Sequence, residues 1–240
     1  MQQEQWQCRW SPTLGELESD ALSVWGTPPY NPEADLNEPC IWFGLYSLRD
    51  FYSIWRHKGK RAILWCGSDI THFINGYWLD DKGRIRINSA PLAKWINENC
   101  DSYVENNVEM EALKKLGIRS KVCPSFLGKV EDYSVSYKWN ERPKIYASIS
   151  GNDFILYCWD KIEEIAAKVP WADFYLYGNT ESWPTKNKNV FVRGRVEKEI
   201  MNEEIKSMSC GLRLLEFDGA SEILVKNLLY GGYPKISHIV

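Results

Sequence analysis

The sequence lacks several features that define large classes of proteins. No apolar run reaches the length that a membrane span needs, and the first ten residues, MQQEQWQCRW, have no signal-peptide pattern. There is no long basic run and the formal net charge is −3, so the electrostatic footprint of a duplex-DNA binder is missing. We therefore expect a cytoplasmic protein without a membrane span or a nucleic-acid partner. A small anionic ligand held by a few local groups is compatible with this charge.

Residues that bind metals or form disulfides are also few or scattered. The seven cysteines are odd in number and widely spaced, and no CxxC pattern occurs. The three histidines, His57, His72 and His238, lie far apart in the sequence. This pattern favours buried, reduced thiols over a disulfide framework or a zinc site, and it argues against a histidine-rich metal centre.

What is present is an ordinary globular composition. Hydrophobic residues make up 44% of the 240 residues and charged residues 25%, which excludes a disordered or fibrous chain. The length suits one large domain or two small ones.

Short apolar runs alternate with helical patterns along most of the chain. Residues 1–39 contain five prolines and are predicted to be irregular, apart from a possible helix over 14–24. In the first half, strands are predicted over 41–46, 62–66, 102–104 and 119–123, with helices over 48–57, 91–99 and 108–116. In the second half, strands are predicted over 144–149, 174–177, 190–192, 212–215 and 234–239, with helices over 154–168, 197–208 and 221–230. This alternation is typical of a parallel sheet covered by helices.

The pattern predicts an α/β fold with two Rossmann-like halves. The first domain covers 1–128 and includes the irregular lead-in 1–39. A polar connection over 129–143 leads to a second domain over 144–240. The first half offers fewer clear strands, so we expect it to be abbreviated.

The most informative segment for chemistry follows the predicted strand 212–215. Small residues at Gly219 and Ala220 allow backbone to approach a ligand, and a helix is predicted to begin near Ser221. The free N–H groups and the dipole of a helix start favour a phosphate. Arg213 could reach the same anion if its side chain points out of the strand end. The alternative is structural: Asp218 and Ser221 would cap the helix while Gly219 makes the turn.

This segment resembles the donor-sugar signature of the GT-B class of glycosyltransferases, which have two facing Rossmann domains. The residues that match in place are Arg213, Asp218, Gly219, Ser221, Leu228 and Gly231. Further likenesses are the segment 189–196 with its following acidic helix, the turn in Ile63-Leu-Trp-Cys-Gly-Ser-Asp69, and the segment 106–124. In order and spacing, the resemblance covers about residues 40–240.

The resemblance implies transfer of a sugar from a nucleotide-diphosphate donor, without a metal or other cofactor, to a carbohydrate, lipid or other small acceptor. The residues expected at the donor are Gly151, Asn152, Gly194, Arg195, Arg213, Asp218, Gly219, Ala220, Ser221, Glu222 and Lys226. The acceptor would enter near Gly67 and Ser68. Asp69 is the candidate catalytic base and His72 its rival, although Asp69 could instead cap a helix and His72 could be an ordinary surface histidine.

Lys226 departs from the family pattern. It falls where the family carries a glutamate that holds the nucleotide ribose, and a lysine cannot accept those hydrogen bonds, although it could reach a phosphate. The chain also ends at Val240, just after the last predicted strand, where family members continue into further helices. Two alternatives therefore stay open: a non-catalytic nucleotide- or sugar-binding or partner protein, and a sugar-nucleotide epimerase of the same architecture.

Two acidic pairs could imitate the carboxylates of metal-dependent sugar transferases. Asp80-Asp81 is followed by Lys-Gly and fits a turn better. Glu216 and Asp218 precede a helix start, where a carboxylate caps.

Overall fold

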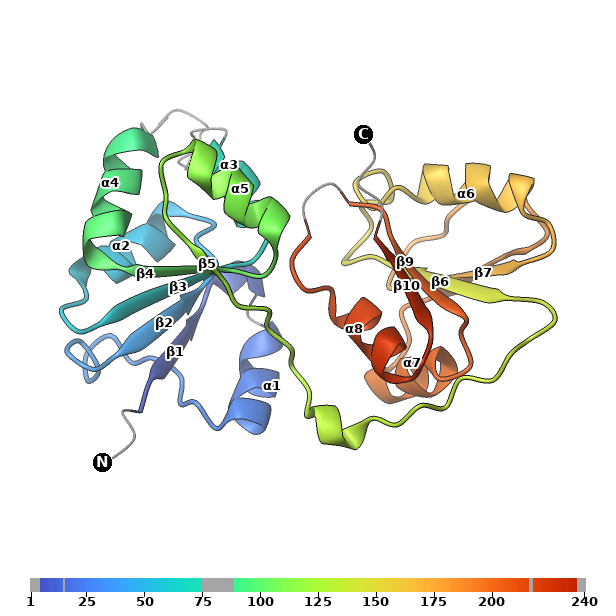
Figure 1. Ribbon diagram of the computed structural model, residues 1–240, viewed down its shortest axis with the longest axis horizontal. Helices are drawn as coiled ribbons and strands as arrows, with labels where there is room; N and C mark the ends of the chain where they lie inside the picture. Colours follow the sequence, from blue (N-terminus) through green and yellow to red (C-terminus); the bar gives the residue numbers. More distant parts are fainter. Residues whose placement is uncertain (1–4, 15, 75–88, 216–217, 237–240) are drawn as a thin grey trace. The chain divides into compact units, whose positions relative to one another are not determined.

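The structure is a computed structural model that describes residues 5–14, 16–74, 89–215 and 218–236. It divides into two compact units. The first comprises residues 1–127 together with 217–220, and the second comprises 128–216 and 221–240. The predicted connection 129–143 therefore groups with the second unit. Figure 1 shows the elements of each unit, which we describe separately.

The first unit contains a sheet of five parallel strands. They are β1 (Gln7–Trp10), β2 (Cys40–Phe43), β3 (Arg61–Trp65), β4 (Asp101–Val104) and β5 (Lys121–Val122). The strands lie side by side in the order of the sequence, from β1 to β5, and every adjacent pair is parallel. Residues 28–30 also pair in parallel with β1, through the bridge between Cys8 and Pro29, on the side away from β2. The chain therefore passes outward from β1 before it returns to form β2.

Helices cover the two faces of this sheet unequally. The helices are α1 (Glu16–Trp25), α2 (Leu48–Arg56), α3 (Ser68–Ile74), α4 (Ser89–Asn99) and α5 (Asn107–Lys115). Buried side chains of α2, α3, α4 and α5 share one core with Trp42 and Trp65 of the sheet. On the other face, the helix whose side chains pack on the sheet within the described ranges is α1, where Ala21 packs with Trp10 and Phe43. Right-handed crossovers in one direction place α2 to α5 on one face, whereas α1 leads from β1 to the bridge at Pro29 in the opposite direction and so lies on the other face.

The second unit contains five parallel strands in a different order. They are β6 (Lys144–Ser148), β7 (Asp173–Tyr177), β8 (Val190–Gly194), β9 (Cys210–Arg213) and β10 (Tyr233–Ile236). The spatial order is β10-β9-β6-β7-β8, with parallel pairing throughout. The chain first builds outward from β6 to β8 and then returns to place β9 on the other side of β6. The order therefore reverses between β6 and β9, as in a Rossmann half.

The helices of the second unit lie on both faces of its sheet. They are α6 (Trp159–Lys168), α7 (Lys198–Ile205) and α8 (Glu222–Leu229), with a 3₁₀ turn at Val130–Asp132. Trp159 and Ile162 of α6 pack with Phe174 and Leu176 on one face. On the other face, Ile205 of α7 packs against Tyr146 and Tyr177 of the sheet. This is the doubly wound arrangement that the alternation in the second half predicts.

The predicted α/β class and its strands from residue 41 onward are confirmed. Gly117 caps the helix predicted over 108–116: its φ is +79°, and the N–H of Ile118 donates to the Leu113 carbonyl at 3.0 Å. The lead-in 1–39 is not wholly irregular, because β1 and α1 lie within it. β1 alternates polar and apolar residues, but at four residues it is too short for this pattern to distinguish it from an irregular segment. The first sheet consequently has as many strands as the second, so the expected abbreviation is wrong in strand number.

One helix boundary is also corrected. The helix predicted over 154–168 begins only at Trp159, because Cys158 has φ of +56° and cannot continue a right-handed helix. Other predictions lie outside the described residues: the Asp80-Asp81 turn, Glu216 and the last three residues of the strand predicted over 234–239.

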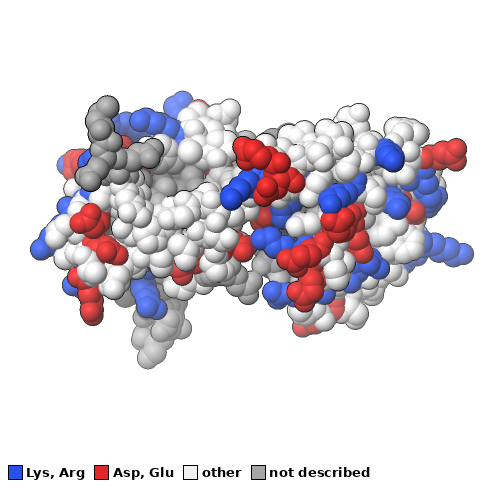
Figure 2. Space-filling model, turned by 90° about the horizontal axis from the view of Figure 1, so that it is seen from below, with Lys and Arg blue, Asp and Glu red and all other residues white. Residues whose placement is uncertain are grey.

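No helix in the described ranges is long and apolar enough to cross a membrane. Figure 2 shows basic and acidic side chains intermixed on the face seen from below, with more of them over the second unit than over the first. This distribution agrees with a chain that carries no long basic run.

Candidate functional site

Ligands of open parallel sheets bind beyond the carboxyl ends of the strands, where the strand order reverses. In the second unit this place is the end of β6 and β9, at Ser148 and Arg213. In the first unit the five strands follow the sequence, and the reversal beside Pro29 lies at the edge of the sheet. The residues that follow β6 and β9 are therefore the first candidates for a ligand site.

Arg213 is the last residue of β9, and its side chain spans the reversal. Its Nη1 donates to the carbonyl of Ser148 at 2.9 Å, and its guanidinium carbon lies 4.7 Å from the ring centroid of Tyr157. The aromatic face and the carbonyl fix the planar guanidinium at the carboxyl edge of the sheet. The sequence predicts an anion-binding role for Arg213, and the structure places its positive charge at the reversal point.

The turn after β6 contains Gly151 and Asn152. Gly151 has φ of +72°, and no atom lies within 4 Å of the position a Cβ would take, so the turn borders open space. The Oδ1 of Asn152 accepts from the N–H groups of Thr180 at 2.9 Å and Glu181 at 3.2 Å, while its Nδ2 donates to Thr180 Oγ1 at 2.9 Å. Asn152 thus joins the turns that follow β6 and β7. The side-chain amide of Asn152 therefore fixes the position of one turn relative to the other.

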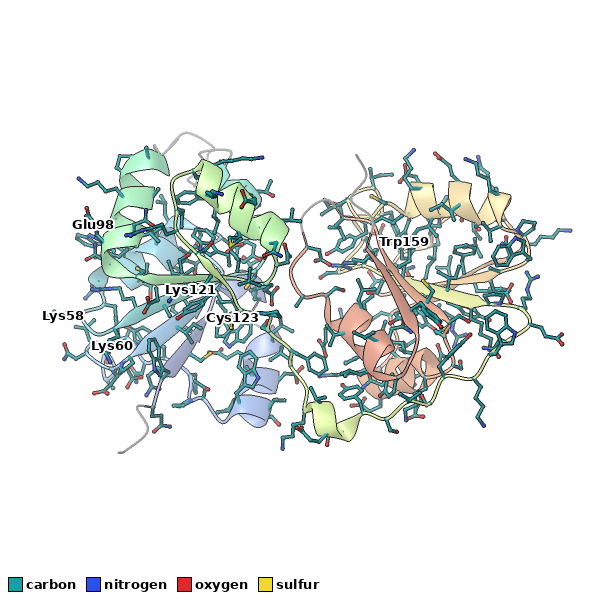
Figure 3. All side chains as sticks on the ribbon, viewed as in Figure 1. Lys58, Lys60, Glu98, Lys121, Cys123 and Trp159 are labelled. Carbon is teal, nitrogen blue, oxygen red and sulfur yellow. The ribbon has the colours of Figure 1, made fainter. Side chains whose placement is uncertain are left out.

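Cys158 carries the only positive φ outside glycine in the described part of the chain. Its Sγ lies 3.5 Å from the carbonyl oxygen of Leu214, the residue after Arg213, and partial burial raises the pKa of the thiol. Backbone strain of this kind is commonly stored at functional sites. The next residue, Trp159, is fully buried beneath α6 (Figure 3), and its Nε1 has no hydrogen-bond partner.

The ends of β7 and β8 lie beside each other. The N–H of Gly178 donates to the carbonyl of Gly194 at 2.9 Å, and both glycines have positive φ. Gly194 and its neighbour Arg195, both predicted at the donor nucleotide, therefore lie at the carboxyl edge. Asn179 is 4% exposed and its Oδ1 has no hydrogen-bond partner. Sequence reasoning did not select Asn179; its only signal was an asparagine after the glycine that ends a strand.

Helix α8 begins after the predicted phosphate-binding segment. Ser221 precedes it, yet its side chain makes no capping hydrogen bond, so the capping alternative does not describe Ser221. Lys226 is buried, and its Nζ lies 2.7 Å from Glu222 Oε1 one turn earlier on the same helix. The cation in the place of the family glutamate is thus engaged by a carboxylate within α8.

Residues 218–220 group with the first unit. The N–H of Ala220 donates to Glu105 Oε2 at 2.7 Å, and Asn106 Nδ2 donates to the carbonyl of Asp218 at 2.9 Å. Glu105 directly follows β4, and Asn106 caps α5 by accepting from the N–H of Glu109 at 3.0 Å. The structure therefore divides the predicted donor residues: 218–220 lie in the first unit, and the others lie in the second.

The predicted acceptor-side residues follow β3. Gly67 has φ of +91°, and Ser68 begins α3. The carboxylate of Asp69 is fully buried and accepts from the N–H groups of Leu45, Cys66 and Ile70 at 2.9 to 3.0 Å. These bonds favour the capping alternative for Asp69.

The rival base, His72, is half-buried, and its ring lies 5.9 Å from that of Tyr46 in an edge-on arrangement.

Buried carboxyl groups gather at the same edge of the first sheet. Burial raises the pKa of Asp69 to about 7 and of Glu109 to about 8, and it raises the pKa of Glu105 as well. Glu109 is fully buried, and its Oε1 has no hydrogen-bond partner. The lysines Lys58 and Lys60 and the carboxylate of Glu98 lie at the opposite, amino-terminal end of the sheet (Figure 3). Sequence reasoning missed Glu105 and Glu109 because they read as an ordinary helix start.

A further buried acid, Asp50, lies in the first turn of α2 in the same unit. Its carboxylate accepts from Arg9 Nη1 and Ser11 Oγ, each at 2.9 Å, and from the N–H groups of Tyr46 and Ser47. Asp50 is fully buried, and Arg9 is 14% exposed. These bonds connect β1, the end of β2 and α2, so Asp50 is a structural centre of the first unit.

Comparison with known proteins finds similarity in structure alone. No protein-family model matches the sequence, and no curated protein sequence matches it. The structure of TarM has a TM-score of 0.55 and 11% identity over 82% of this chain. A mutant TarM from S. aureus in complex with fondaparinux, alpha-GlcNAc-glycerol and UDP has a TM-score of 0.57 and 12% identity over 82% of this chain. The pneumococcal O-GlcNAc transferase GtfA in complex with UDP and GlcNAc has a TM-score of 0.55 and 9% identity over 85% of this chain.

These likenesses confirm the fold that the GT-B resemblance implies, namely two parallel-sheet α/β halves. The matched parts amount to 40%, 41% and 43% of the three solved chains, so this chain spans less than half of their length.

Proposed function

We propose that this chain binds a nucleotide-diphosphate sugar at the carboxyl edge of the second sheet and transfers the sugar to a small acceptor. The observation that carries the proposal is the position of Arg213. Its guanidinium lies where the strand order reverses, held by the Ser148 carbonyl and the Tyr157 ring. Two solved structures of the same fold are described as complexes with UDP, which supports a nucleotide as the ligand.

The chemistry of such a transfer requires that negative charge on the leaving diphosphate be stabilised. A guanidinium fixed by packing does this with little reorganisation, and its planar set of N–H donors matches phosphate oxygens. The glycine turns at Gly151 and Gly194 leave the neighbouring edge accessible to a base and ribose. In this proposal the backbone N–H groups of residues 219–222 contribute to the diphosphate site, and no metal takes part.

On the acceptor side, Asp69 and His72 are the proposed candidates for the base, beside Gly67 and Ser68. A pKa near 7 suits a base at neutral pH, which supports Asp69. Its burial and its three backbone hydrogen bonds support the structural alternative. The turnover rate and the melting temperature are measured for Asp69→Asn and His72→Gln. A loss of turnover at an unchanged melting temperature supports a catalytic role, and a parallel loss of both supports a structural role.

The test is nucleotide binding by the full chain. Isothermal titration and thermal shift with UDP, GDP and ADP should show binding of at least one, because saturating ligand adds stability. Arg213→Ala should weaken that binding about tenfold or more while changing Tm little. The matched control is Arg142→Ala, since Arg142 lies before β6 at the other end of the sheet and pairs with Asp173. Equal loss of binding and stability in Arg213→Ala would instead support a packing role.

A second candidate function is a binding or partner protein that does not catalyse transfer. The observation in its favour is Lys226, which replaces the family's ribose-binding carboxylate and is already paired with Glu222. Incubation with nucleotide sugars distinguishes the two candidates. Release of free nucleotide diphosphate supports the enzyme, whereas tight binding without release supports the binding protein.

A further inference from the structure

The backbone of residues 218–220 is already occupied by a carboxylate of the first unit. Glu105 Oε2 accepts from the N–H of Ala220 at 2.7 Å, and Asn106 Nδ2 holds the carbonyl of Asp218 at 2.9 Å. A carboxylate on a backbone N–H just ahead of a helix takes the position that a phosphate oxygen takes in phosphate-binding turns.

Two glycines make this close approach possible. A Cβ at Gly219 would overlap the carboxylate of Glu105, so a larger residue at 219 would require that side chain to move. A Cβ at Gly67 would lie 3.3 Å from the nitrogen of Gly219, and the φ of +91° at Gly67 is itself a glycine conformation. The Asp-Gly pair that resembles a donor signature therefore has a second physical reason in this chain. It admits the side chain of Glu105.

Glu105 is held in place by its neighbours. Its backbone N–H donates to Glu109 Oε2 at 2.9 Å, and its carboxylate also accepts from the hydroxyl of Ser125. Glu109 is fully buried, and its Oε1, which has no hydrogen-bond partner, lies 3.5 Å from the position of a Gly67 Cβ. One acidic side chain thus contacts the N–H of Ala220, and a second acidic side chain holds the backbone of the first.

A metal ion does not account for this arrangement. In the ranges that the structure describes, no three His, Cys, Asp or Glu side chains are grouped to hold one. The partners that the structure gives to the Glu105 carboxylate are instead the N–H of Ala220 and the hydroxyl of Ser125. The geometry is that of a backbone N–H which could bind an anion and which already donates to a carboxylate.

We propose that Glu105 is an internal competitor of the donor diphosphate. Its carboxylate occupies the N–H of Ala220, and the diphosphate must displace it to bind there. The inference rests on the proposed function, which assigns this N–H to the donor. An incoming diphosphate that met the carboxylate in place would be repelled by it, so the affinity of the unmodified chain is lower than its donor groups alone allow.

The decisive comparison is UDP affinity in Glu105→Gln and the unmodified full chain, measured by isothermal titration at one pH and salt concentration. Glutamine keeps the size of the side chain and removes its charge. We expect the Kd for UDP to fall about tenfold. The matched control is Glu111→Gln, because Glu111 is an exposed acid on the same helix as Glu109 and pairs only at the surface with Lys114, at 3.3 Å. Its Kd should not change.

A second measurement tests the contact without any nucleotide. In Glu105→Ala the amide of Ala220 loses its acceptor, so its hydrogen exchange should accelerate at least tenfold relative to the unmodified chain and to Glu111→Ala. Unchanged exchange would show that the contact is not made in solution and would overturn the inference.

The outcomes separate the two proposals. If the unmodified chain binds UDP and Glu105→Gln binds it equally or more weakly, the competitor role is wrong and the donor site stands. If no variant binds UDP, GDP or ADP, the proposed function fails and the competitor role fails with it. If Glu105→Gln binds UDP where the unmodified chain does not, both are supported.

Discussion

The two sheets have equal numbers of parallel strands but differ in the order of those strands. In the first unit the five strands follow the sequence and the reversal lies at the sheet edge beside Pro29, whereas in the second unit β9 returns beside the central strand β6. The second sheet therefore has its reversal at a central strand, with α6 packed on one face and α7 and α8 on the other. The number of strands alone therefore does not locate a ligand site, because two sheets with the same number of strands can differ in where the strand order reverses.

The carboxyl edges of the two sheets differ in the same sense. In the first unit the edge is filled by buried carboxyl groups, among them Asp50, Asp69 and Glu109, which mostly hold the unit's own backbone and side chains. In the second unit the edge carries a guanidinium, Arg213, and glycine turns beside open space. The first edge is stabilised by these hydrogen bonds and includes the proposed acceptor side, whereas the second is proposed to bind the donor.

Removing the acid at the centre of the first unit should have the largest effect. Asp50→Ala leaves Arg9 without its partner in a largely buried position and removes the acceptor for Ser11, Tyr46 and Ser47. We expect the free energy of unfolding to fall by about 4 kcal/mol, as measured by urea denaturation followed by circular dichroism. Asp101→Ala, at an exposed strand start, is the control and should cost less than about 1 kcal/mol. Similar losses in both would contradict the structural role of Asp50.

The pH dependence of stability sharpens the contrast further. Burial raises the pKa of Glu109 from its ordinary 4.5 to about 8, so between these values the folded chain keeps a proton that the unfolded chain releases. Stability should therefore fall as pH rises from 5 to 9, and the penalty is complete above pH 8. Glu109→Gln cannot release this proton, so its Tm should fall less over that range, by roughly 5 °C.

The control for this measurement is Glu111→Gln on the same helix, whose Tm should follow the unmodified chain. The charges of Glu105 and Asp69 help to raise the pKa of Glu109, so the difference between the profiles reports Glu109 together with its coupling to these two acids. Parallel profiles for Glu109→Gln and the unmodified chain would show that Glu109 is ionised in the folded state.

The smallest effect is expected at the charged pair of the second unit. Lys226→Met removes the partner of Glu222, which keeps partial exposure and a favourable place in the first turn of α8. We expect the free energy of unfolding to change by about 1 kcal/mol and the Kd for nucleotide to change less than about twofold. A tenfold loss of nucleotide affinity, measured by titration calorimetry, would show that Lys226 leaves Glu222 to hold the phosphate.

The sequence predicted the strands and helices from residue 41 onward because apolar runs and helical spacing are local properties. It could not predict how β9 returns to β6, although that reversal locates Arg213. It also could not show that Glu105 and Ala220 share a hydrogen bond, since residues so far apart in sequence carry no periodic signal. The left-handed Cys158 escaped detection for another reason: no propensity favours that conformation in cysteine.

The strand order of the first sheet also has a consequence for how the chain folds. Because each new strand pairs with the one made just before it, this sheet can grow from β1 to β5 as the polypeptide is synthesised. In the second sheet, one edge of the central strand β6 pairs with β9 (Cys210–Arg213). That edge of β6 therefore stays unpaired until nearly the whole chain has been synthesised.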